Sequence, residues 1–289
     1  MSSVKKPSTS DHLTPAAIRE AHDRIKDKII RTPLMTSSSI DEMTGAIVYF
    51  KCENLQKIGA FKARGAANAV FSLTDEEAAR GVATHSSGNH AAALARAAKL
   101  RGVKAHIVMP NNVPKAKQAS VQRLGAAIVF CEPTLAAREA AAAKLVEETG
   151  ATFVHPYDDL RVMAGQGTTG IELLQQAPWL DAILCPIGGG GLISGTAVAA
   201  KSIKPSIKVI GVEPAGADDA YRSFKAGKRI PMEKPNTIAD GLRGSLSEVT
   251  FAHICEYVDD VVTVSDDAIV KSMRATWEIM KIIVEPSGA

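Results

Sequence analysis

The sequence is poor in aromatic residues and in net charge. Only 4% of its 289 residues are Phe, Trp or Tyr, and the formal net charge at pH 7 is +3. So small a charge gives no reason to expect nucleic acid or an anionic membrane surface as a partner. No apolar run approaches the roughly 20 residues that span a bilayer. With 46% hydrophobic and 22% charged residues, the composition is that of an ordinary globular protein.

Cysteines are also few. Cys52, Cys131, Cys185 and Cys255 are widely separated, and each lies in or beside an apolar segment. No pair has the spacing of a metal site. We interpret all four as buried, reduced thiols, which indicates a cytoplasmic protein. Residues 1–10 lack the apolar core of a signal peptide, and we expect them to form a disordered tail.

Short apolar runs alternate with alanine-rich segments along the chain, beginning with a helix that Thr14 would cap and Pro15 would start. This alternation predicts an α/β fold with mostly parallel sheets. We expect a small doubly wound domain at residues 76–155, inserted into a large domain made of residues 1–75 and 156–289. The expected strands are 47–50, 82–84, 105–109, 127–130, 152–154, 183–187, 208–212 and 261–264, and helices are expected near 15–29, 61–73, 89–101, 114–124, 134–149, 160–176, 191–203, 217–226 and 266–281.

Four consecutive glycines stand between an expected strand and an expected helix: Gly188, Gly189, Gly190 and Gly191. Backbone N–H groups can converge there without Cβ clashes, which predicts a phosphate cup at a helix N-terminus. No Gly-Lys-Ser/Thr follows, so a nucleotide P-loop is excluded. A dinucleotide site stays open, because Glu213 lies where a ribose-binding carboxylate would, although the glycine spacing differs from that fingerprint. A merely flexible loop is the weaker alternative.

Three more segments lie where strand ends meet helix starts. Residues 59–65 (GAFKARG) contain Lys62, which is either an ordinary surface lysine or a desolvated, nucleophilic amine. Residues 84–90 (THSSGNH) suit a carboxylate ligand, or are simply a serine-rich helix cap. Residues 238–241 (IADG) indicate a turn.

Together these motifs resemble the fold-type II pyridoxal-phosphate enzymes, specifically the serine/threonine dehydratase and serine racemase family. The resemblance runs from about residue 14 to the last residue and includes GAFKARG, SSGNH, the four glycines, a Glu-Pro-…-Ala-Asp-Asp segment at 213–219 and IADG, in family order. It is closest to eukaryotic-type serine racemases and to relatives that cleave 3-hydroxyaspartate. It implies a tryptophan synthase β-like fold with two doubly wound parallel-sheet domains.

The resemblance assigns roles to residues at matching positions. Lys62 would form the Schiff base with pyridoxal 5'-phosphate, Phe61 would pack beside the cofactor ring, and the four glycines would bind its phosphate. Asn89 would hydrogen-bond the ring hydroxyl, and Glu285 belongs to the same cofactor set. The substrate carboxylate would be held by Ser86, Ser87, Gly88, Asn89 and His90.

The resemblance also implies a structural Mg²⁺ or Mn²⁺ held by Glu213, Asp219 and the carbonyl of Ala217, since oxygen ligands suit hard cations. A solvated acidic turn is the alternative. Arg138 matches a residue near the domain interface, although a surface arginine on the 134–149 helix is nearly as good an interpretation. A homodimer is expected from the resemblance alone.

The reaction that the resemblance implies is β-elimination from L-serine, L-threonine or a related 3-hydroxy amino acid, giving a keto acid and ammonia. Lys62 would remove the Cα proton on one face. Return of a proton from Ser87 on the opposite face would instead invert Cα, so a serine racemase is the alternative. An inactive, truncated cofactor-binding homologue is the non-enzymatic alternative.

Several positions depart from the family pattern. Ala60 replaces a serine, and Ala91 and Ala92 replace the Gly-Gln of racemases that respond to ATP. Gly244 replaces a serine near the substrate, so substrate preference is expected to differ. The sequence ends at Ala289, inside a family motif and before the usual partner of the pyridine nitrogen, and we expect a fragment or a short form.

Overall fold

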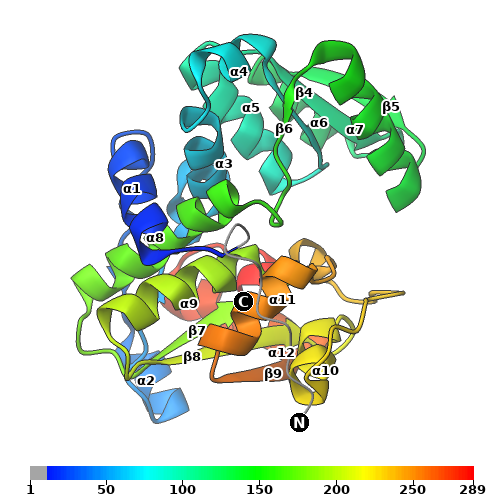
Figure 1. Cartoon of the computed structure of the whole chain (residues 1–289). Coiled ribbons are helices and arrows are strands. Elements are labelled where there is room, and N and C mark those ends of the chain that lie inside the picture. The colour runs from blue at the N-terminus through cyan, green and yellow to red at the C-terminus, as the bar shows by residue number, and fades with distance from the viewer. Residues whose placement is uncertain (1–11) are drawn as a thin grey trace.

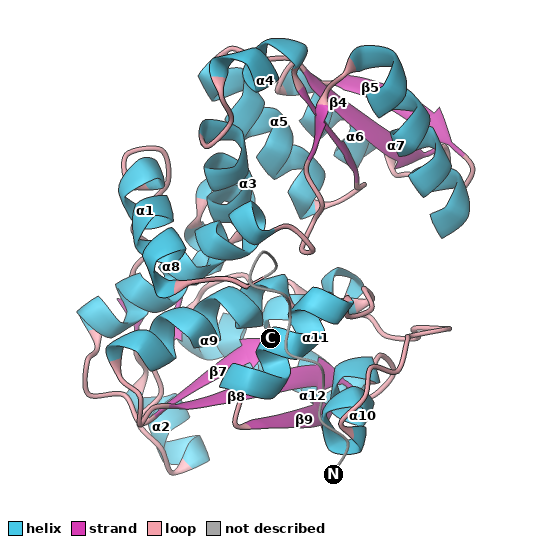
Figure 2. Cartoon of the chain, in the orientation of Figure 1, coloured by secondary structure: helices cyan, strands magenta, loops and turns pink. Residues whose placement is uncertain are grey.

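The computed structural model describes residues 12–289 and contains two bodies, each built on a parallel sheet (Figure 1). The small domain has the four-stranded sheet β5-β4-β3-β6, and the large domain has the three-stranded sheet β7-β8-β9. Helices pack around both sheets (Figure 2). The predicted α/β fold is confirmed, whereas the predicted domain limits remain a prediction, and the expected tail at residues 1–10 lies outside the described part.

The elements alternate along the chain as the apolar pattern predicts. The strands are β1 (Leu34–Met35), β2 (Phe50–Lys51), β3 (Val82–His85), β4 (Ala105–Pro110), β5 (Ala127–Cys131), β6 (Thr152–Phe153), β7 (Ala182–Pro186), β8 (Lys208–Pro214) and β9 (Asp260–Val264). The α-helices are α1 (Pro15–Ile25), α2 (Ser38–Thr44), α3 (Lys62–Phe71), α4 (Asp75–Arg80), α5 (Asn89–Arg101), α6 (Lys115–Arg123), α7 (Leu135–Thr149), α8 (Leu160–Gln176), α9 (Gly191–Ile203), α10 (Asp219–Ala226), α11 (Glu248–Tyr257) and α12 (Asp266–Ala275), the last followed by a π-helical turn at Thr276–Met280.

The expected strand at 47–50 is wrong. Only Phe50 belongs to a strand, β2, which pairs antiparallel with β1 instead of joining a parallel sheet. Ile47 is 73% exposed, so the apolar run there does not mark a buried strand. The prediction also missed α2, α4 and α11. Thr74 with Glu77 caps α4 reciprocally, which is a signal visible in the sequence. Ser247 and Thr250 cap α11 in the same way, but without the usual Glu or Gln.

Three helices meet through glycines at the centre of the molecule. A Cβ built on Gly165 of α8 would lie 2.6 Å from the Cα of Gly65 in α3. On the other side of α8, a Cβ on Gly195 of α9 would lie 2.6 Å from the backbone nitrogen of Gly167. Helix backbones therefore touch directly at both contacts, and α8 holds the start of α3 and the start of α9 in one rigid arrangement.

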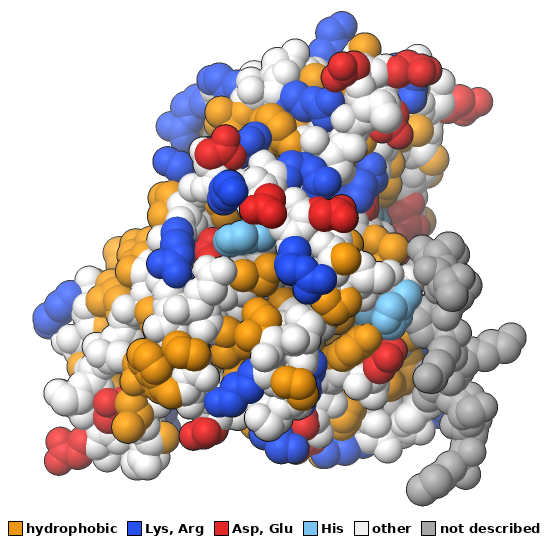
Figure 3. Space-filling view, turned by 60° about the vertical axis from the view of Figure 1, so that its left-hand side comes forward, with side chains coloured by type: hydrophobic (Ala, Val, Ile, Leu, Met, Phe, Trp, Pro, Cys, Tyr) orange, Lys and Arg blue, Asp and Glu red, His pale blue; other side chains and the backbone are white. Residues whose placement is uncertain are grey.

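The two faces of the large sheet differ. Ile183 and Cys185 of β7 and Val261 of β9 are buried against α8, α9 and α11. On the opposite face, Leu184 is 67% and Val262 38% exposed. Strand alternation thus places apolar side chains on an open face in the described chain. On the face of the molecule shown in Figure 3, basic and acidic side chains are interspersed, in keeping with the small net charge. None of the helices between residues 12 and 289 is both long and apolar enough to cross a bilayer.

Gly165→Ala tests the backbone contact between α3 and α8. Alanine's higher helix propensity would by itself stabilise α8 by about 1 kcal/mol. Overpacking costs about 1–3 kcal/mol, and the three backbone atoms within 2.9 Å of the new Cβ favour the upper end of that range. We therefore expect a net decrease of about 2 kcal/mol in the free energy of unfolding, measured in urea. Gln175→Ala, on the exposed side of the same helix, should change it by less than about 0.5 kcal/mol. A Gly165→Ala variant as stable as the control would contradict the contact.

Candidate active site

Lys62 is the first residue of α3, and its side chain reaches the segment between β6 and α8. Its amine donates a hydrogen bond to the carbonyl oxygen of Pro156 over 2.8 Å. Its nitrogen also lies 5.2 Å from the centroid of the Phe61 ring. Desolvation lowers the pKa of this amine to about 8, so a substantial fraction is neutral and nucleophilic close to neutral pH. The surface-lysine interpretation does not fit this enclosed amine.

Arg64, two residues further along α3, is fully buried at the centre of an ion cluster. Its guanidinium binds both Glu53 oxygens at 2.8 and 2.7 Å and both Glu172 oxygens at 2.8 Å. Lys51 completes the cluster by donating to Glu172 over 2.6 Å. Such bidentate pairs fix direction as well as distance. The cluster therefore orients the first turn of α3, and with it Lys62.

The four glycines connect β7 to α9, and the protein itself requires each of them to be glycine. Gly190 has a positive φ of 86°. A Cβ at Gly188 would lie 3.0 Å from the Cα of Leu242, and one at Gly191 would lie 2.9 Å from the Cβ of Tyr157. A Cβ at Gly189 would overlap the Tyr157 ring. The loop is thus packed on two sides, which does not fit a merely flexible loop.

Residues 86–90 follow β3 and lead into α5, as predicted. The Ser86 hydroxyl accepts a hydrogen bond from the Gly88 N–H over 3.3 Å. Asn89 donates its side-chain amide to Glu285 at 3.2 and 3.3 Å. The His90 ring is buried and bonds the Val154 carbonyl at 3.1 Å. Its side chain therefore faces β6, and only its N–H, at the helix start, is placed to hold a carboxylate.

Glu213 and Asp219 lie together at the carboxyl end of β8. Glu213 is fully buried and accepts hydrogen bonds from the N–H groups of Ala220 and Tyr221 at 3.1 and 2.7 Å. Burial, reinforced by the Asp219 charge, raises the pKa of Glu213 to about 8. Asp219 accepts from the Ser245 hydroxyl at 3.1 Å, and burial raises its pKa too. Glu213 is thus turned inward, away from any ribose, and the dinucleotide interpretation does not fit.

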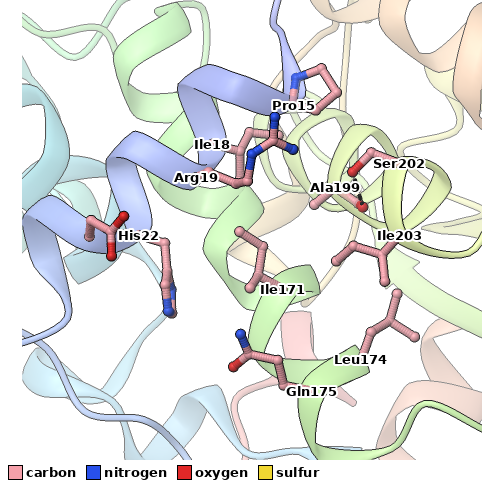
Figure 4. A pocket seen from close by; sticks show the side chains of 11 residues that line it. Pro15, Ile18, Arg19, His22, Ile171, Leu174, Gln175, Ala199, Ser202 and Ile203 are labelled. Atoms are coloured by element: carbon pink, nitrogen blue, oxygen red, sulfur yellow. Dashed lines mark hydrogen bonds between the residues drawn. The ribbon is translucent and has the colours of Figure 1, made fainter.

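A hollow of about 440 Å³ lies elsewhere, between α1, α8 and α9 (Figure 4). Its lining is mostly apolar, including Ile18, Ile171 and Leu174, with Arg19 and His22 at one side. None of the predicted site residues lines it. The candidate active site is therefore the region around Lys62, the glycine loop and residues 86–90, and not this hollow.

A model of the family "Pyridoxal-phosphate dependent enzyme" matches residues 25–289. The chain belongs to this family. It is 55% identical to serine racemase of Arabidopsis thaliana over 273 residues, 94% of this chain and 82% of the relative. It is 52% identical to beta-hydroxyaspartate dehydratase of Paracoccus denitrificans over 269 residues, 93% and 85% of the two chains. The structure of maize serine racemase has a TM-score of 0.94 and 51% identity, covering 96% of this chain and 84% of that one. The predicted fold-type II architecture is confirmed.

The residues present fit pyridoxal phosphate. The enclosed amine of Lys62 can attach to an aldehyde, and the glycine loop offers N–H groups at the start of α9, where an anion is favoured. Roles for Phe61, Asn89, Ser87 and Glu285 remain predictions. No group of three or more His, Cys, Asp or Glu side chains is arranged as a metal site within residues 12–289, so any metal there would depend on two carboxylates and a carbonyl.

Sequence reasoning missed Pro156, Tyr157 and the Arg64 cluster. Pro156 and Tyr157 follow the expected strand at 152–154, and ligands in such folds bind beyond the carboxyl ends of strands. That rule would have pointed to them. The sequence gives no local indication that Arg64 pairs with Glu172, because the two residues are 108 positions apart.

Gly189→Ala tests whether the cup depends on the Tyr157 contact. The new Cβ would displace the ring, and we expect the affinity of the apoprotein for pyridoxal phosphate to fall at least tenfold in a fluorescence titration. Gly244→Ala is the matched control. Its Cβ would lie 3.4 Å from the Gly189 nitrogen and 3.5 Å from Tyr157 Cε1, nearly ordinary contacts, and the affinity should change less than threefold. Equal losses in the two variants would contradict the role of the contact.

Proposed function

We propose that this chain is a pyridoxal-phosphate-dependent serine racemase that also eliminates the β-hydroxyl of its substrate. The observation that carries the proposal is the enclosed Lys62 amine beside the glycine cup, in a chain 55% identical to a serine racemase. Racemisation is better supported than the ammonia-lyase activity expected first. Elimination remains the companion reaction, because both begin with removal of the same Cα proton.

The chain's own residues divide the work as follows. The start of α5 and residues 86–88 bind the substrate carboxylate. Bound pyridoxal phosphate withdraws electrons from the Cα atom and makes its proton acidic. Lys62, with a pKa of about 8, accepts that proton on one face. The Ser87 hydroxyl exchanges a proton on the other face, which inverts the centre.

A 3-hydroxy dicarboxylate is the second substrate candidate. Arg138 of α7 has a buried Nε atom with no hydrogen-bond partner among the described residues. Its charge acts on both His85 and Tyr157, so it lies near these two residues. A second carboxylate would pair with this guanidinium, and a relative 52% identical is a beta-hydroxyaspartate dehydratase.

Glu213, Asp219 and the carbonyl of Ala217 are proposed to hold a structural Mg²⁺ or Mn²⁺. Two buried carboxylates whose pKa values are both raised by burial are costly to ionise without a cation. Oxygen donors suit these metals. A homodimer also remains part of the proposal, on the resemblance alone.

Incubation of the chain with pyridoxal phosphate and L-serine tests the function. We expect D-serine by chiral chromatography, and pyruvate as a second product. Lys62→Ala should abolish both, together with the visible absorbance band that borohydride removes, whereas Lys57→Ala, at an exposed site, should not. Because the amine has a pKa of about 8, the rate of attachment should rise with pH up to about 8 and then level off.

The other outcomes are equally decisive. Pyruvate without D-serine would make the chain a lyase. A stable band with neither product would make it the inactive cofactor-binding homologue. Turnover of 3-hydroxyaspartate that exceeds turnover of serine, and is lost in Arg138→Ala, would favour the dicarboxylate.

Mg²⁺ or Mn²⁺ should raise the Tm of the chain. At a hundredfold excess over its Kd, a ligand of the folded state stabilises it by about 2.7 kcal/mol, roughly 5 °C or more for a chain of this size. Glu213→Gln should remove the shift, and Glu233→Gln, at an exposed site, should keep it. An unchanged Tm with both metals, or a shift that survives Glu213→Gln, would overturn the metal site.

A further inference from the structure

The segment between β6 and α8 crosses from the small domain to the large one through the candidate site. Its Pro156 carbonyl accepts the hydrogen bond of the Lys62 amine at 2.8 Å. Its Asp158 carboxylate accepts the Ser247 hydroxyl at 2.7 Å, next to α11. Tyr157 lies between these two anchors, so its backbone is held directly beside the reacting amine.

The Tyr157 side chain belongs to an aromatic row. The row starts at His85, the last residue of β3, whose ring lies 5.6 Å from that of His155. His155 in turn meets the Tyr157 ring edge-on at 4.6 Å. His155 Nδ1 accepts hydrogen bonds from the N–H groups of Tyr157 and Asp158 at 3.3 and 2.8 Å, which fixes its ring. The row thus runs from the start of the carboxylate-binding loop to Tyr157.

At its other side, Tyr157 closes the glycine cup. Its ring lies where a Cβ of Gly189 would be, and its Cβ is 2.9 Å from the Cβ position of Gly191. The edge of the ring at Cε1 faces Gly244, where a Cβ would make an ordinary contact at 3.5 Å. The ring therefore packs along the glycine loop, and its Cε1 edge points toward Gly244.

The phenol oxygen has no hydrogen-bond partner among the described residues, since Tyr157 donates only its backbone N–H. Burial raises the pKa of the phenol, helped by the charges of Asp158 and Asp219. The group therefore stays protonated at neutral pH and can donate or accept a hydrogen bond. Glu139 of α7 also raises the pKa of the phenol and Arg138 of α7 lowers it, while the Tyr157 ring packs on the glycine loop that precedes α9.

We infer that Tyr157 is the specificity-determining residue of this site: its ring walls the phosphate cup, and its phenol hydrogen-bonds the oxygen substituent on the substrate's Cβ. The inference rests on the proposed function. A donor held against the substrate disfavours substrates that lack the matching oxygen, because such substrates leave it unpaired. Tyr157 would thereby favour 3-hydroxy amino acids over alanine.

Two substitutions separate the ring from the hydroxyl. In Tyr157→Phe the wall remains, so the Kd of the apoprotein for pyridoxal phosphate, measured without turnover, should change less than threefold. Its kcat/KM for L-serine should fall about tenfold more than its kcat/KM for racemisation of L-alanine. In Tyr157→Ala the wall is lost, and the Kd should rise at least tenfold. Tyr49→Phe, whose ring lies against Trp179 away from the candidate site, is the matched control.

The outcomes distinguish this inference from the proposed function. If the wild-type chain neither attaches pyridoxal phosphate nor racemises L-serine, the proposed function fails. If the wild-type chain does both, and Tyr157→Phe affects serine and alanine equally, the phenol does not contact the substrate and the inference is overturned. If Tyr157→Ala binds pyridoxal phosphate with wild-type affinity, the Tyr157 ring does not form a wall of the phosphate cup.

Discussion

Direct contact between helix backbones is the constraint on which the site depends. The helix α8 touches α3 at Gly65 and Gly165, and it touches α9 at Gly167 and Gly195. The first residue of α3 is Lys62, and the first residue of α9 closes the glycine cup. Because interiors are close-packed and transmit strain, the separation between the amine and the cup is set by these contacts. The contacts of α8 with α3 and α9 therefore also determine where Lys62 and the glycine loop lie.

The Arg64 cluster also fixes the contact between α3 and α8, through hydrogen bonds instead of backbone packing. Burying an arginine and two carboxylates carries a large desolvation cost, and apolar side chains of similar volume could stabilise the fold equally well. Apolar contacts, however, have no preferred direction and would not fix the orientation of α3. Four hydrogen bonds from one planar guanidinium to Glu53 and Glu172 leave α3 a single rotation about its axis. A helix that must present a lysine at its first residue gains from that restriction.

The sequence predicted well whatever depends on local pattern. Apolar runs placed β3 to β9, and motif spacing placed the glycine cup and residues 86–90 at the ends of strands and Lys62 at the start of a helix. It failed at 47–50, because an exposed apolar run around Ile47 resembles a buried strand. It failed also for Tyr157, because the contact of its ring with Gly189 joins segments that only the folded chain brings together. Gly189 and Gly191, which we predicted to bind a phosphate, must also lack a side chain because Tyr157 packs against them.

The histidines of the site narrow the choice of proton donors for the proposed reaction. Burial lowers the pKa of His90 to about 3 and that of His155 to about 4, so both rings are neutral at pH 7. His155 Nδ1 already accepts two backbone N–H groups, and His90 is turned toward Val154. Neither ring can return a proton to Cα. In the proposed reaction that task would fall to the Lys62 ammonium on one face and to a hydroxyl on the other, so the balance between inversion and elimination would depend on how the Ser87 and Tyr157 hydroxyls are held.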